Sequence, residues 1–408
     1  MTRMFVDAWD PSYGSSFEGG EDGPASPSSA QVDTDVEVPA AEWAPIDVPP
    51  GRTTPDVVLL VDGVRRNDAG LWTQEEDGSS YAGLAASFAA GVVRCDLARG
   101  SAELVDARVA RGLFTASPSA QVDTDVEVPS AEWAPIDVPS GLRAPDVVFL
   151  VDGVRRNDAG LWTQEEDGTS YAGLAASFAA GVVRCDLARG SAELVDARVA
   201  RGLFTASPSA QDLQTGMVRY EVHRVSGPGE ASKLPAAVQP QLTALEIEIS
   251  AMARQNADLL VVDGPLRNRR HLPRTLGFVK RQQSQYLSAT LNAVVTSLRP
   301  GQRTPVFHLG TVWGGWSWYL RLPGGSGAPW SGIVRVECSP DLTPEQAIEL
   351  AELSGVTLPR FASSAYKDPR APQNLVPIAG LERRLRGMLG DARVLHRALT
   401  LATARNRA

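Results

Sequence analysis

The sequence predicts an α/β fold in which helices flank a mixed sheet, with a duplicated three-strand unit in the N-terminal half. Two observations support this prediction. Apolar runs ending in Val-Asp-Gly occur three times, at residues 61–63, 151–153 and 262–264. In the second half, such strands alternate with segments whose apolar residues recur at three- and four-residue steps, as in helices. An Asp at the end of a buried strand lies at the rim of the sheet, where α/β proteins place their binding sites.

Composition is typical of a globular protein. The chain has 408 residues, 43% hydrophobic and 21% charged, which is enough for two or three domains. We found no apolar run of about 18 residues, so we expect no membrane span, and residues 1–10 lack the apolar core of a secretion signal. The cysteines are two repeat equivalents, Cys95 and Cys185, together with Cys338. This pattern predicts a cytoplasmic protein without a disulfide framework or a zinc site.

Charge is distributed unevenly along the chain. The net charge is −9, yet residues 210–408 contain 24 basic and only 15 acidic side chains. A basic half beside an acidic half suggests a polyanionic partner such as DNA. The simpler alternative is a solvated surface with a chance imbalance.

A 90-residue unit dominates the organisation. Residues 30–119 and 120–209 differ at only seven positions, far fewer than is usual in solenoid repeats. A recent tandem duplication or an error in assembling the sequence would both explain this. We therefore divide the chain into a flexible segment (1–29), a first copy displaced from the main sheet (30–119) and a main domain (120–408).

Within the second copy, residues 146–152 predict a strand that ends at Asp152, and residues 155–160 predict a turn. Residues 171–186 and 192–204 read as a hairpin around the turn at 189–191, which gives three adjacent strands.

The remaining elements follow in order. We expect strands at 217–225, 259–263, 304–309, 316–322 and 332–338. We expect helices at 241–256, 276–298, 343–353, 378–389 and 392–404, with Thr343 as the N-cap of the third.

Acidic side chains on these elements form the candidate site. The set is Asp152 or its copy Asp62, with Glu246, Asp263 and, as a further candidate, Asp368. Oxygen ligands of this kind suit Mg²⁺ or Mn²⁺, and such ions can activate water for phosphodiester cleavage. The alternative is that each Asp caps a turn, since Asp-Gly is a common turn pair.

The order of these motifs resembles the NurA nuclease family. The likeness rests on the Val-Asp-Gly strand and hairpin, on Glu246 and Asp263 seventeen residues apart, on Gly277-Phe278-Val279-Lys280, and on the strand at 319–322. It covers residues 57–114 or 147–204 together with 217–380. The resemblance implies an RNase H-like fold, Mn²⁺- or Mg²⁺-dependent DNA cleavage, a HerA-type hexameric ATPase (helicase) as partner, and a homodimer.

Carried over by position, Asp152 or Asp62 matches the first-strand metal ligand, Glu246 the helix ligand and Asp263 the ligand of the later strand. Lys280 matches the lysine of the family, which would face a phosphate; a solvated helix lysine is the alternative. The sequence departs from the family in two ways. Residues 372–382 contain no His to close the site, so Asp368 or Asn374 would have to substitute. In addition, one sheet has room for only one copy of the repeat. We favour the second copy, because it connects directly to residue 217.

Basic and aromatic residues beyond Asp263 are candidates for nucleic-acid contacts. The basic candidates are Arg267, Arg269, Arg270, Arg274, Lys280 and Arg321. Trp313, Trp316, Trp318 and Trp330 could stack on unpaired bases, although core positions explain them as well.

Two other functions compete with the nuclease. A non-catalytic nucleic-acid-binding or helicase-partner subunit would explain the missing His and the extra copy. A carboxylate-pair hydrolase acting on sugars would leave the basic half unexplained.

Overall fold

The computed structural model describes residues 3–6, 55–74, 80–115, 122–225, 234–281, 286–310, 314–325 and 328–405. The chain divides into two compact units. The larger unit comprises Met1–Ala25, Ser119–Leu287 and Ala293–Ala408, and the smaller comprises Ser26–Pro118 with Ser288–Asn292. Of the segment 1–29, for which we expect flexibility, only strand β1 (Arg3–Val6) falls within the described residues.

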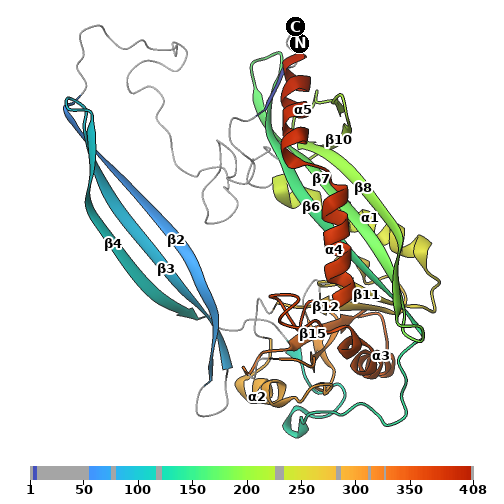
Figure 1. The fold of residues 1–408 in the computed structure, drawn as a ribbon. Coiled ribbons are helices and arrows are strands. Elements are labelled where there is room, and N and C mark those ends of the chain that lie inside the picture. The colour runs from blue at the N-terminus through green and yellow to red at the C-terminus, as the bar shows by residue number, and fades with distance from the viewer. Residues whose placement is uncertain are drawn as a thin grey trace. The chain divides into compact units, whose positions relative to one another are not determined.

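The larger unit is a mixed α/β structure built on one twelve-stranded sheet (Figure 1). The strand order is β5-β13-β14-β15-β12-β11-β6-β7-β8-β10-β9, and β1 pairs with β6 beside this path. The strands after β1 are β5 (Val122–Asp123), β6 (Val147–Gln164), β7 (Ser170–Asp186), β8 (Ser191–Thr205), β9 (Leu213–Gln214), β10 (Arg219–Arg224), β11 (Leu259–Asp263), β12 (Thr275–Val279), β13 (Phe307–Leu309), β14 (Trp316–Arg321) and β15 (Ile333–Cys338). The helices are α1 (Leu234–Ala253), α2 (Ala289–Ser297), α3 (Pro344–Thr357), α4 (Val376–Met388) and α5 (Ala392–Arg405). The predicted fold class, a mixed sheet flanked by helices, is therefore observed.

The two copies of the repeat have different places. The second copy supplies β6, β7 and β8 to the large sheet, whereas the first forms a separate three-stranded sheet of β2 (Val57–Gln74), β3 (Ser80–Asp96) and β4 (Ser101–Thr115). The predicted hairpin and its three adjacent strands are confirmed in both copies.

Strand β6 is longer than the sequence suggested. The strand was expected to end at Asp152 and turn at residues 155–160, but it pairs with β7 without interruption as far as Gln164. A bulge between Asn157 and Ala159 takes up Asp158. The Asp158 carboxylate turns inward there and accepts hydrogen bonds from the hydroxyls of Ser177 and Tyr220. The first copy continues as a strand in the same way, with the same bulge and with the equivalent Asp68 exposed. Pairing within the three-strand unit, rather than burial of the Asp, therefore explains why a turn-like sequence continues as a strand.

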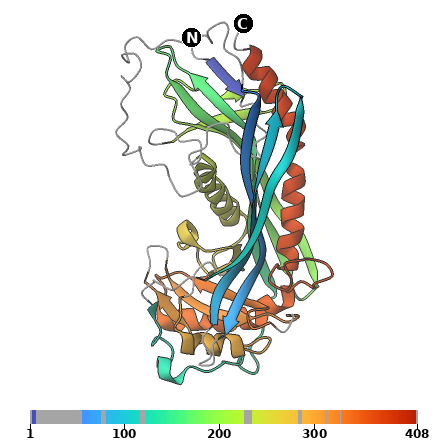
Figure 2. The same cartoon turned by 90° about the vertical axis from the view of Figure 1, so that its left-hand side faces the viewer.

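Alternating side chains of β6 pack into two cores on opposite faces of the sheet. Val148, Leu150 and Val154 pack with Leu381 and Leu385 of α4. On the other face, Phe149 and Val151 pack with Val238, Leu242 and Ile249 of α1. Figure 2 shows α1 and the α4–α5 pair on opposite sides of these strands. Glycines permit the close approach of both helices, since a Cβ at Gly153 would lie 2.6 Å from Leu242 and one at Gly181 would lie 2.8 Å from Leu381.

One predicted helix is wrong. The sequence predicts a helix over residues 276–298, but Thr275–Val279 form strand β12 between β11 and β15, and of the described residues in this range only Ala289–Ser297 are helical. The tight packing of Gly277 against Glu337, whose Cγ lies 2.8 Å from where a Cβ would be, favours the strand over the local helical pattern. The helix capped by Thr343 is confirmed, with a capping box to Gln346. Among the described residues, no helix has the length and apolarity needed to cross a membrane.

Gly181→Val is expected to lower the free energy of unfolding by about 1–3 kcal/mol, the usual cost of overpacking a core. The physical reason is that the added methyl groups collide with Leu381 and Leu385 of α4. Urea unfolding followed by tryptophan fluorescence measures the change.

The duplicated unit provides a matched control for this variant. Gly91 is the equivalent of Gly181 in the first copy, and a Cβ there finds its nearest atom at 3.5 Å. Gly91→Val should therefore unfold as wild type does; an equal loss in both variants would mean that valine weakens the strand itself rather than its packing on α4.

Candidate metal centre

The centre of the site is the parallel pairing of β11 with β6. In this register Val262 lies opposite Val151, and the next residue on each strand is an Asp. Asp263 ends β11, whereas Asp152 lies within the longer β6. Because neighbouring strands lie about 4.8 Å apart, side chains in register on one face are in contact. The predicted meeting of two carboxylates from adjacent strands is confirmed for Asp152 and Asp263.

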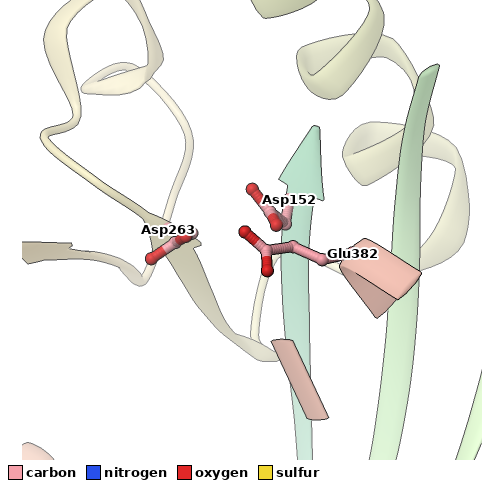
Figure 3. A group of neighbouring side chains, drawn as sticks. All are labelled: Asp152, Asp263 and Glu382. Carbon is pink, nitrogen blue, oxygen red and sulfur yellow. The ribbon is translucent and has the colours of Figure 1, made fainter. Parts of the chain in front are cut away.

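A third carboxylate comes from helix α4. One oxygen each of Asp152, Asp263 and Glu382 lies within 4.8 Å of the others (Figure 3). Glu382 was not among the sequence candidates. Its position carried a signal nonetheless, because it follows Ile378 by four residues and precedes Leu385 by three, on the buried stripe of α4.

Glu246, the expected helix ligand, lies outside this cluster. Side chains alternate along a strand, so Asp152 points toward α4 while Gly153 points toward α1, where the Glu246 carboxylate packs against it. Glu246 is buried and forms an ion pair with the equally buried Arg269. Its place on α1 puts it on the face of the sheet opposite the cluster. The structure brings Asp152 together with Glu382 instead.

Lys280 connects the cluster to a polar loop. Its ammonium donates to Asp263 Oδ2 at 2.7 Å and to Asn374 Oδ1 at 2.9 Å. The Asn374 amide in turn donates to Asp368 at 2.5 Å. Lys280 therefore lies between the carboxylate cluster and the two suggested fourth ligands, Asn374 and Asp368. Lys280 follows strand β12 and does not lie on a helix.

Arg370 holds Glu382 in place. Its guanidinium donates to both carboxylate oxygens of Glu382, at 2.8 and 3.3 Å, and also to Asp368. This hydrogen bonding lowers the pKa of Glu382, against the opposing effect of burial. Hydrogen bonds from Asn374 and Arg370 likewise outweigh burial and lower the pKa of Asp368. Both groups are therefore anionic at neutral pH.

The two aspartates have the opposite electrostatic environment. Burial raises the pKa of Asp152 well above its ordinary value of 3.8, and repulsion from Asp263 raises it further. Burial also raises the pKa of Asp263, against the opposing effect of Lys280. Asp152 Oδ2 and Asp263 Oδ1 are buried and accept no hydrogen bond from any residue that the structure describes. Orphaned oxygens on crowded carboxylates are the donor set that a hard divalent cation satisfies, so these residues could hold Mg²⁺ or Mn²⁺.

A cavity of about 680 Å³ opens beside the cluster. Asp263, Glu337 and Glu382 line it together with a larger number of basic side chains: Arg267, Lys280, Arg281, Arg335 and Arg370. Tyr286 also lines it, and the Arg335 guanidinium lies 5.3 Å above its ring. Arg267 adopts φ of 47°, a left-handed backbone that is costly for a residue with a side chain and that concentrates at functional sites.

The other proposed contact residues differ in how accessible they are. Arg269 is buried against Glu246, and Arg321 donates to the carbonyls of Thr296 and Pro329. Arg270 and Arg274 are exposed. Trp318 and Trp330 are buried and Trp316 is half-buried, so these three do not present free faces for stacking. Trp313 lies outside the described residues.

Asp62 is placed with the first copy. It is exposed in the three-stranded sheet and accepts a hydrogen bond from the Gly63 N–H, as Asp152 does from Gly153. The described cluster of three carboxylates contains Asp152 in its place.

No protein-family model matches the chain, and no curated protein matches it. Among solved structures it is similar to endonuclease V from Bacillus subtilis, with 13% identity over 60% of this chain and 81% of that one, at a TM-score of 0.29. It is also similar to the catalytic domain of human endonuclease V, with 18% identity, coverages of 63% and 86%, and the same TM-score of 0.29. Both likenesses are remote and say nothing of what this chain does.

Asp152→Asn is expected to raise the melting temperature in EDTA at pH 7.5 by a few degrees. The pKa of Asp152 is higher in the folded than in the unfolded chain, so the ionised carboxylate destabilises the fold. Wild type should lose stability as the pH rises from about 4 through the raised pKa, and the variant should lose less. Mn²⁺ should raise the melting temperature of wild type and leave that of the variant unchanged.

Asp62→Asn is the control, since Asp62 is exposed in the separate sheet. Calorimetry should give this variant the wild-type melting temperature in EDTA and the wild-type rise in melting temperature with Mn²⁺. If Mn²⁺ leaves the melting temperature of the wild type unchanged, the assignment of Asp152 to a cation site is contradicted.

Proposed function

We propose that this chain is a divalent-metal-dependent nuclease of NurA type that hydrolyses phosphodiester bonds in DNA. The observation that carries the proposal is the convergence of Asp152, Asp263 and Glu382 beside a cavity with basic walls. Carboxylates that bind a cation and cationic groups that bind phosphate are the two requirements of metal-assisted phosphodiester cleavage. The excess of basic residues in 210–408 supports a polyanionic substrate.

Each group of the site has a role in this proposal. A bound Mg²⁺ or Mn²⁺ would supply a Lewis acid and an activated water. Asp152, Asp263 and Glu382 would hold the ion, and Arg370 would fix the orientation of Glu382. Arg267 and Arg281, on the cavity wall, would bind the phosphate backbone. Lys280, which now bonds to Asp263, would balance the charge of the cluster and reach a bound phosphate.

One observation favours the alternative of a non-catalytic DNA-binding or helicase-partner subunit. The Lys280 ammonium already lies 2.7 Å from Asp263, so a cation is present beside the carboxylates without any metal. In a non-catalytic binding subunit, the carboxylate cluster would serve to form this ion pair with Lys280 rather than to hold a metal ion. The resemblance that suggests the nuclease also suggests a HerA-type ATPase partner and a homodimer, and we retain both as proposals.

Glu382→Gln is expected to lower the rate of Mn²⁺-dependent cleavage of end-labelled single- and double-stranded DNA by about 100-fold or more, the scale of losing one electrostatic contact to a transition state. Asp263→Asn should have a similar effect, because each variant removes one charged ligand. Single-turnover kinetics separate this loss from weaker DNA binding.

Glu248→Gln is the matched control, because Glu248 is exposed on α1 and pairs with Arg198 away from the cluster. It should cleave as wild type does. Wild-type protein that binds DNA but does not cleave it with Mn²⁺ or Mg²⁺ would refute the nuclease and support the binding subunit.

A further inference from the structure

The first copy of the repeat reproduces the surfaces by which the second copy holds its place in the large sheet. Strands β2, β3 and β4 pair in the same register as β6, β7 and β8, and the bulge at Asn67/Ala69 repeats the one at Asn157/Ala159. Of the seven differences between the copies, only Leu59/Phe149 lies within these strands. The three strands of the first copy and those of the second therefore have nearly the same sequence and the same pairing, but different surroundings.

Equivalent side chains differ sharply in burial between the copies. Leu60 is 57% exposed whereas Leu150 is completely buried, and Val61 is 71% exposed against 1% for Val151. Val64 and Phe88 are likewise exposed where Val154 and Phe178 are buried. Exposed apolar surface of this extent is unfavourable in water and favours any state that covers it.

The second copy shows which elements cover this sequence. Its two faces pack on α1 and α4, and its edges pair with β11 and β10. The residues that make the polar contacts of the second copy are also present in the first. Arg156 donates to the carbonyls of Leu389 and Gly390, and Asp158 accepts from Tyr220; the first copy carries Arg66 and Asp68 at these positions.

The segment before the strands also has a duplicate. In the second copy, Glu127 bonds to the buried Arg303, and the ring of Trp133 lies 6.0 Å from that of Phe307. The sequence repeats these residues as Glu37 and Trp43. The first copy therefore contains every side chain that these contacts require.

We propose that the two copies are alternative occupants of one place in the large sheet, and that the chain exchanges between them. When the first copy occupies the place, Asp62 stands beside Asp263 and Glu382 as Asp152 does in the state described here. Only this role of Asp62 as an alternative ligand rests on the proposed function. The exchange itself rests on the matching surfaces.

Two effects set the balance between the states, and both are small. Phe149 fills the core at α1 better than Leu59 would, but such a conservative change is a small effect. Seating the first copy makes the second a 90-residue excursion. When the second copy is seated, the first is the excursion, because β1 and β5 on either side of it both pair within the large sheet. The entropic penalty grows only with the logarithm of the loop length, so the two excursions nearly cancel. We therefore expect the exchanged state at roughly 0.1–10% of molecules, a usual range for a minor state.

Disulfide trapping tests the exchange without reference to activity. In a full-length chain with Cys95, Cys185 and Cys338 replaced by Ala, the pair Val151→Cys and Val262→Cys joins two strands in register and should cross-link fully. The test pair is Val61→Cys and Val262→Cys, which can cross-link within one molecule only if the first copy occupies the place beside β11. Oxidation over hours should accumulate this product, because each excursion is trapped.

Glycine variants should shift the yield in opposite directions. Gly181→Val crowds α4 only when the second copy is seated, so it should raise the initial rate of trapping by about 10-fold or more, as expected for an overpacking penalty. Gly91→Val places the same clash in the exchanged state and should suppress the product. Peptide mass spectrometry after tryptic digestion identifies the linked strands.

The outcomes decide the proposal. Absence of the Val61–Val262 product, even with Gly181→Val, when the control pair cross-links fully would overturn the exchange. Products that are covalent dimers would overturn exchange within one chain. If the nuclease is also correct, Asp152→Ala should keep residual cleavage that Asp62→Ala with Asp152→Ala abolishes. Cross-linking without any nuclease activity would sustain the exchange while refuting the proposed function.

Discussion

The site depends on one constraint, the register of the parallel pair β11–β6. Val262 opposite Val151 requires that the following aspartates lie side by side on one face. A shift by one residue would move one carboxylate to the α1 face, because successive side chains point to opposite sides. The buried Val, Leu and Phe residues on both faces of β6 prevent that shift. Core packing thus determines where the charges meet.

That register has an electrostatic consequence. Asp152 and Asp263 are held together in a buried environment that opposes their ionisation. The neighbouring positive groups are arranged unequally around them. Lys280 bonds to Asp263, and Arg370 bonds to Glu382. Within the described part of the chain, Asp152 accepts a hydrogen bond only from the N–H of its neighbour Gly153. The unbalanced charge is therefore concentrated at Asp152, which is the place where a divalent cation would relieve the most repulsion.

The sequence predicts the two carboxylates of this site that lie on strands, Asp152 and Asp263, but not Glu382, which lies on a helix. Asp152 and Asp263 each follow an apolar run, and that pattern is local. The choice between Glu246 and Glu382 depends on which helix covers which face, and this is decided by contacts between residues far apart in the sequence, those of β6 with α1 and with α4. Glu246 was a candidate metal ligand because its helix directly precedes β11. Side chains alternate between the two faces along β6, however, so Gly153 and not Asp152 lies opposite Glu246. The strand Thr275–Val279 was missed for a similar reason, since pairing with β11 and β15 overrides its helical pattern.

The duplicated unit separates local from tertiary causes within one chain. Both copies form the same three strands with the same register and the same bulge, so the hairpins follow from the sequence of the unit alone. The burial of these side chains does not follow from the sequence of the unit. Val61 and Val151 occupy equivalent positions in the same strand pattern, yet Val61 is exposed and Val151 is buried. What buries the second copy is the set of elements that follow it, namely α1, β11 and α4. Since these elements form one place for two nearly identical sheets, the assignment of a copy to the large sheet is a question of relative stability. Only Leu59/Phe149 differs between the strands of the two copies, so the packing of this side chain against α1 is the physical term that distinguishes them.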